Sequence, residues 1–201
     1  MKRLHAAISL AAASLLLATA AYSQAPSRIR GTITAVQGNN LTVKSRDGQE
    51  LQLEIAPNAT FAYMRKMSLA DIKPGTPLGT TAVKDASGKL VAREVHIFNP
   101  DKPIPNEGHR PWDLEPQSTM TNATVSTVAQ AGQGNEIKLK YKDGEQTVVV
   151  PPGTPVVMAV ESDRSLLVPG AYAFIAVAPG AGGKLTATRL QVTKDGVRPP
   201  Q

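Results

Sequence analysis

Hydrophobic and polar residues alternate in short segments along most of the chain that follows its apolar N-terminal stretch. Leu41 and Val43 alternate with polar neighbours, Asp47-Gly48 interrupts the pattern, and the alternation resumes over positions 51–55. An Asp-Gly pair between two alternating segments is a strong hairpin signal, because it suits the backbone of a tight turn. The pattern therefore predicts an all-β fold built from short antiparallel strands.

The same pattern returns in the second half of the chain, around Asp143-Gly144. Three landmarks recur at nearly constant offsets of 96, 95 and 95 positions. They are Arg46-Asp47-Gly48 with Lys142-Asp143-Gly144, Lys73-Pro74-Gly75 with Val168-Pro169-Gly170, and positions 88–92 with 183–187. Three landmarks at nearly one spacing predict an internal duplication. Copy one spans residues 28–98 and copy two residues 122–192.

The last segment of each copy contains a slip in its alternation. Leu90 and Ala92 keep a period of two, and the apolar positions then move to Val95 and Ile97. Residues 185–192 repeat this slip, which predicts a β-bulge in the closing strand of each copy.

A short helical turn is expected between the third and fourth strands of copy one. Ser68 and Asp71 have the spacing of a capping box. Pro74-Gly75 then ends the turn.

Each copy is long enough for five or six short strands, which suits a small sheet closed into a barrel without free edges. We therefore expect two tandem barrels of the OB or SH3-like kind. A Pro-rich link over residues 99–121 would join them, and residues 193–201 would form a tail. The competing arrangement is one larger sandwich made from both copies. The polar link argues against it.

The first residues have the three-part pattern of a secretory signal peptide. Met1-Lys2-Arg3 is basic, residues 6–21 are mainly apolar, and Ala21-Tyr22-Ser23 offers small residues for cleavage. Cleavage after Ser23 removes residues 1–23 and takes two positive charges from the formal net charge of +6. No later apolar stretch is long enough for a transmembrane helix. We expect a soluble protein in the periplasm or secreted from the cell.

Composition excludes several kinds of chemistry. The chain has no cysteine, so it has no disulfide, thiolate metal site or cysteine nucleophile. It also lacks a Gly-x-Ser-x-Gly motif, a P-loop and a dinucleotide fingerprint. Aromatic residues are 4% of the chain and basic residues are scattered among acidic ones, which disfavours nucleic-acid binding. We expect a protein that is not an enzyme, needs no cofactor and binds no nucleic acid.

The link contains the most distinctive residues of the chain. Trp112 is the only tryptophan, and His109, Glu107 and Asp113 lie close to it in sequence. We interpret Trp112 as an anchor that packs against a barrel near the junction, with His109 exposed beside it. These four residues are the candidate binding site. They also offer imidazole and carboxylate ligands, although a zinc site needs three or four in a defined geometry.

Two further positions have metal-ligating side chains. His96 lies between Val95 and Ile97, so alternation places it on the opposite face, where we expect solvent. It is a weaker candidate metal ligand, alone or with His109. Met64 and Met67 are too few for a copper carrier, and we expect them to fill gaps in the core.

Several of these segments resemble the DUF5666 family of exported bacterial β-barrel domains. The resemblance rests on residues 31–36 and 41–43, on Lys73-Pro74-Gly75 and on residues 88–92. Copy two departs from it at its start, where Ala123 replaces Gly31. With residues 107–114 between the copies, the whole chain resembles a group of small exported proteobacterial proteins. Some of that group carry a "metal ABC transporter permease" label, which the lack of a membrane span in this sequence contradicts.

The resemblance implies a fold and a location but no activity. We expect a non-catalytic binding or assembly module of the bacterial cell envelope, whose partner is an envelope protein or a surface ligand. The alternative is a periplasmic metal-handling accessory protein, linked to a metal transport system without being its permease.

Overall fold

The structure is a computed structural model that describes residues 27–132, 134–180 and 183–199. The expected signal peptide lies outside these residues. The described chain consists of strands and two short 3-10 turns. The elements are β1 (Arg28–Gln37), β2 (Asn40–Ser45), β3 (Glu50–Lys66), η1 (Leu69–Asp71), β4 (Pro77–Lys84), β5 (Leu90–Ile97), β6 (Gly108–Pro111), β7 (Thr119–Ala131), β8 (Gly134–Tyr141), β9 (Gly144–Val150), β10 (Val156–Ser162), η2 (Arg164–Leu166), β11 (Tyr172–Pro179) and β12 (Leu185–Val192).

The local predictions hold. The hairpin between β2 and β3 turns at Asp47-Gly48, where Gly48 has a positive φ of 88° and its N–H donates to the Ser45 carbonyl. Asp143 occupies the corresponding turn between β8 and β9. Ser68 caps η1 in a complete capping box with Asp71.

Both closing strands contain the expected bulge. The β4–β5 register shifts between Thr81 and Ala82, which leaves Arg93 as the extra residue of β5. The β11–β12 register shifts between Ala176 and Val177, which leaves Thr188 as the extra residue of β12. Arg93 and Thr188 are 95 positions apart, the offset of the sequence landmarks. The internal duplication itself stays a prediction.

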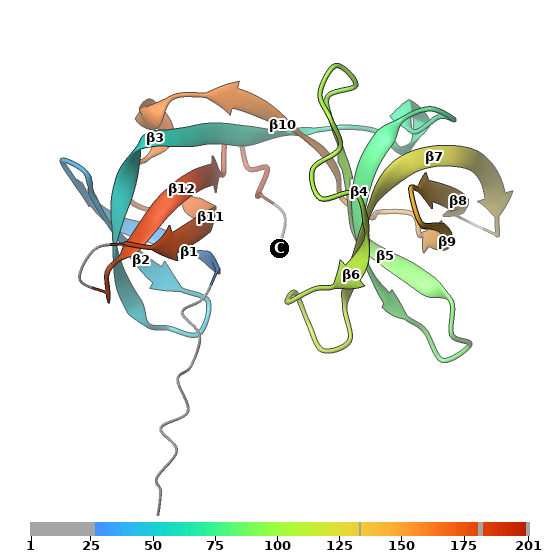
Figure 1. Cartoon of the computed structure of the whole chain (residues 1–201), viewed down its shortest axis with the longest axis horizontal. Coiled ribbons are helices and arrows are strands. Elements are labelled where there is room, and N and C mark those ends of the chain that lie inside the picture. The colour runs from blue at the N-terminus through green and yellow to red at the C-terminus, as the bar shows by residue number, and fades with distance from the viewer. Residues whose placement is uncertain (1–26, 133, 181–182, 200–201) are drawn as a thin grey trace, which may run out of the picture.

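Strand pairing joins the two copies in a way that the sequence did not predict. β1, β2, β3, β11 and β12 pair in succession, and parallel pairing of β12 with β3 closes them into a five-stranded barrel, which we call the first ring. β5, β4, β7, β8 and β9 form a second circuit, closed where Leu90 and Val91 pair with Val148 and Val149 of β9. Each ring thus combines three strands of one copy with the last hairpin of the other (Figure 1).

The expectation of two tandem barrels, one from each copy, is therefore not confirmed. The physical reason is the length of β3, which is one continuous strand of 17 residues. Because each residue of a strand adds about 3.3 Å, a strand of this length extends well beyond one small barrel. β3 pairs with β2 and β12 and then with β10, so it carries the chain from the first ring to the second (Figure 1).

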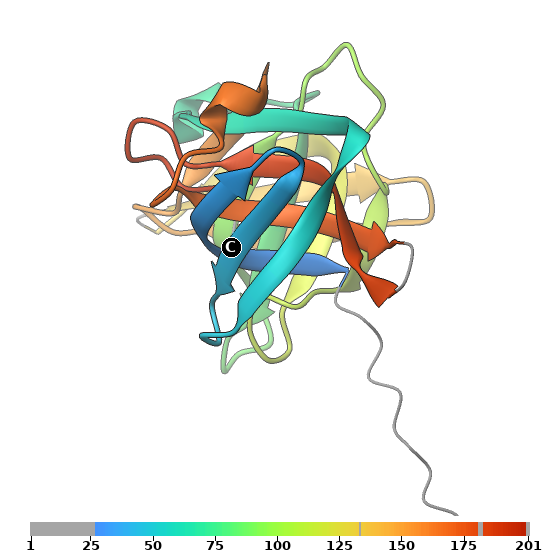
Figure 2. The same ribbon diagram turned by 90° about the vertical axis from the view of Figure 1, so that its left-hand side faces the viewer.

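Each ring has its own apolar core. Figure 2 looks onto the first ring, where the blue strands β1 and β2 lie beside the orange and red strands β11 and β12. The alternating residues Leu41 and Val43 are fully buried there, together with Ile175 and Leu190 from the other copy. The core of the second ring is also shared between the copies. Its buried residues are Ile72, Leu78, Ala82, Leu90, Ala92, Val95, Ile97, Ala123, Val125, Ile137, Leu139, Val148, Val150 and Val156.

Candidate functional site

The link between the copies lies against both rings. Its residues 108–111 form β6, which pairs with β7, and β7 begins at Thr119, inside the range expected for the link. The Arg46 guanidinium, next to the β2–β3 turn, donates to the Leu114 carbonyl at 3.2 Å. Arg93 of β5 binds the Glu115 carboxylate at 2.6 Å. The link is therefore held by side chains from each ring.

Asp113 is the centre of an ion-pair cluster. Arg30 donates to both of its carboxylate oxygens, at 2.8 and 3.2 Å, and Arg28 approaches to 3.4 Å. Burial alone would raise the pKa of Asp113. The hydrogen bonds and charge of Arg30, with the charge of Arg28, outweigh burial and hold that pKa below its usual value. Asp113 is therefore ionised and bound at neutral pH.

Trp112 is half-buried between two arginines. The Arg28 guanidinium carbon lies 4.1 Å from the ring centroid. The guanidinium carbon of Arg110 lies 5.5 Å from the same centroid. Both distances are within the range of cation–π contacts. The indole Nε1 is buried and has no hydrogen-bond partner among the described residues. Trp112 therefore lies where β1 meets the link, close to the junction of the rings.

Among the described residues, His109 and Glu107 make no hydrogen bond or ion pair with Asp113 or Trp112. The His109 side chain is exposed, and its Nδ1 is 2.8 Å from the Thr121 hydroxyl. Partial burial and the nearby charges of Lys84 and Arg110 lower its pKa. Glu107 is exposed. Among the described residues no three His, Asp or Glu side chains are close enough together to hold a metal ion.

The expectation that His96 is solvated is wrong. Only 15% of its side chain is exposed, and its Nε2 lies 3.3 Å from the carboxylate of the buried Glu94. Alternation does place His96 opposite the core residues Val95 and Ile97. That outer face of β5 is not open at this point, however, because the His96 side chain lies against the buried Glu94.

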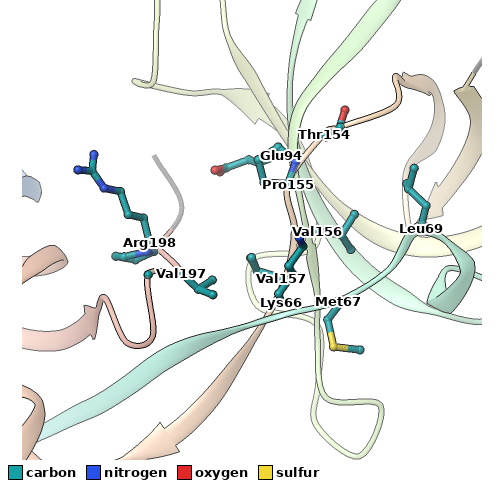
Figure 3. Close-up of a pocket in the computed structure, with 13 residues that line it drawn as sticks. Lys66, Met67, Leu69, Glu94, Thr154, Pro155, Val156, Val157, Val197 and Arg198 are labelled. Carbon is teal, nitrogen blue, oxygen red and sulfur yellow. The ribbon is translucent and has the colours of Figure 1, made fainter.

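A cleft lies between the rings. It has a volume of about 550 Å³. Figure 3 shows Val197 and Arg198 of the C-terminal segment on one side, and Glu94, Pro155 and Val157 on the other. The expected gap-filler Met67 packs partly against the second core and also lines the cleft. The walls are mainly apolar, with Lys66, Glu94 and Arg198 as the charged groups.

Sequence reasoning missed a second hollow on the first ring. It has a volume of about 390 Å³ and contains three arginines, Arg28, Arg30 and Arg46, with Asp47 and Asp113. We call this hollow the arginine pocket. Arg28 and Arg30 lie on β1 and Arg46 lies in the following hairpin, so the sequence does not place the three side chains in one local cluster.

Comparison with protein-family models, with curated proteins and with solved structures finds no match to this chain.

Proposed function

We propose that this protein is an exported, non-catalytic binding protein of the bacterial cell envelope, and that its ligand lies in the cleft between the rings. The observation that carries the proposal is the cleft itself, with its volume of about 550 Å³. Apolar walls with a few charged groups are typical of ligand sites, which often form between structural units. The N-terminal pattern and the DUF5666 resemblance support the envelope location.

The histidine environments support a role without catalysis. The hydroxyl beside His109 belongs to Thr121, which is fully buried. The hydroxyl that binds Glu94, next to His96, belongs to the fully buried Thr81. A buried hydroxyl on a core strand cannot reach a substrate as a nucleophile.

The described residues give the metal-handling alternative no comparable support. Asp113 is bound by two arginines, and His109 contacts Thr121 instead of a carboxylate. No helix in the described part of the chain is long and apolar enough to cross a membrane.

Binding of small neutral amphiphiles tests the cleft. The mature protein would be titrated with Nile red and with a panel of neutral amphiphiles observed by NMR. Val197→Glu places a charge in the cleft wall, whereas Val168→Glu changes an apolar residue that is 52% exposed and outside the cleft. We expect Val197→Glu to abolish binding and Val168→Glu to retain it. Absence of binding to the wild type, or equal loss in both variants, would overturn the proposal.

A further inference from the structure

Five arginines gather around two carboxylates at the arginine pocket and its border. Arg28, Arg30 and Arg46 line the pocket. Arg110 lies against Trp112. Burial and the charge of Arg28 lower the pKa of Arg189 on β12. Asp113 is bound by Arg28 and Arg30, and Asp47 accepts a hydrogen bond from the Ser45 hydroxyl.

The positive charge here is not compensated. Among the described residues, Arg46, Arg110 and Arg189 have no carboxylate within ion-pair distance. Burial, and then the charge of Arg28, lowers the pKa of both Arg110 and Arg189, which shows that the guanidinium groups oppose one another. Of these three arginines, Arg46 lines the pocket, and an anion bound there would give it the charged partner that it lacks.

We propose that the arginine pocket binds a phosphate group carried by a larger molecule. Guanidinium groups match the oxygens of phosphate in paired hydrogen bonds. Phosphate offers more acceptor oxygens and more charge than a carboxylate. This suits Arg46, which has no carboxylate partner among the described residues, beside Arg28, whose ion pair with Asp113 is long at 3.4 Å. A volume of about 390 Å³ also leaves room for the group to which the phosphate is attached.

This site is separate from the cleft of the proposed function. The two hollows share no lining residue. Either site can therefore fail its test without affecting the other, because the neutral amphiphiles used for the cleft do not report on the arginine pocket.

Arg46→Gln is the decisive variant. Arg46 is exposed, and its side chain makes one hydrogen bond among the described residues, to the Leu114 carbonyl, so its replacement should leave the fold intact. Arg65→Gln is the matched control, since Arg65 is exposed on β3 outside the pocket. Thermal denaturation of both variants would verify that they are folded.

Inorganic phosphate and glycerol phosphate would be titrated calorimetrically into the wild type and both variants, with acetate as the carboxylate control. We expect Arg46→Gln to weaken phosphate binding at least tenfold, Arg65→Gln to leave it unchanged, and added salt to weaken it in all three proteins. Failure of the wild type to bind either phosphate, equal binding by Arg46→Gln, or equally tight binding of acetate would overturn the proposal.

Vesicles identify the source of the phosphate. Sedimentation with phosphatidylglycerol vesicles but not with phosphatidylcholine vesicles, lost in Arg46→Gln, would indicate a lipid headgroup. Binding of glycerol phosphate without sedimentation would indicate a soluble phosphate ester.

Discussion

Met64 of β3 pairs directly with Ala159 of β10, and the two residues are 95 positions apart, the offset of the sequence landmarks. If the duplication is real, the antiparallel ribbon of β3 and β10 is centred on one pair of equivalent residues, as in the interface of a symmetric dimer. Met64 is 1% exposed, yet it belongs to neither of the two apolar cores. It is buried at the crossing between them.

We predict that the protein unfolds in one cooperative transition, because neither copy can complete a ring without the other. Met64→Ala should lower stability by about 3 kcal/mol, as expected for truncation of a buried methionine, and Tm by roughly ten degrees. Met158→Ala, at a half-buried position on β10, should cost less. Scanning calorimetry tests both points, and two separate transitions in the wild type would contradict the shared rings.

The exchanged pairing can be tested with engineered disulfides, because the sequence has no cysteine. Thr32 lies directly opposite Tyr172 on antiparallel strands. The Cα atoms of such a pair are about 5 Å apart, which suits a disulfide. Thr32→Cys with Tyr172→Cys should therefore cross-link within one chain on mild oxidation. If each copy closed on itself, Thr32 would face the equivalent Pro77 instead. Thr32→Cys with Pro77→Cys should stay reduced, and the reverse result would disprove the exchange.

Trp112→Ala should destabilise the protein. The indole is half-buried and stacked by Arg28. Its loss should cost about 2 kcal/mol, less than for a core tryptophan. Tm should fall by several degrees. His109→Ala should have little effect, since the imidazole is exposed. The emission of this single tryptophan provides a second measurement, and a water-exposed indole with no change in Tm would identify Trp112 as a displayed contact residue.

His109 should contribute to acid sensitivity. Its folded-state pKa lies below the usual 6.5, so the neutral form is favoured by folding. That contribution is fully present above about pH 6.5 and is lost as the pH falls through the folded pKa. When the pH is lowered from about 7.5 to about 5, the Tm of His109→Gln should therefore fall by less than the Tm of the wild type.

Glu107→Gln, at an exposed neighbouring position, is the control and should behave like the wild type. An NMR titration in which the His109 ring titrates at or above pH 6.5 would refute the assignment.

The sequence predicted the local features because they depend on neighbouring residues. The turn at Asp47-Gly48, the Ser68 cap and the slips that mark the two bulges are determined within a few positions. The exchange of hairpins depends instead on pairing between strands that lie far apart in the sequence. Tyr172 and Pro77 occupy equivalent positions, so alternation alone cannot indicate which of them pairs with Thr32. The unbroken length of β3 decides it, and the sequence pattern did not show where that strand would end.

The candidate site was predictable in part for a similar reason. Composition pointed to Trp112 and Asp113 as unusual residues in the link. Their partners Arg28 and Arg30 lie far earlier in the chain, and only the closed ring brings them near. His96 was misplaced because alternation distinguishes the core face from the outer face and does not show whether the outer face is open to solvent.

The pairing of Arg28 with Ala176 also sets the order in which the molecule can be completed during synthesis. The first strand made is closed by the last two, β11 and β12, whereas every strand of the second circuit is present once β9 exists. A chain released early therefore keeps its N-terminal strands as open edges, even with the second circuit complete. Such edges invite aggregation and proteolysis. Proteases should therefore degrade truncated products, and a chain with a closed first ring should be a full-length chain.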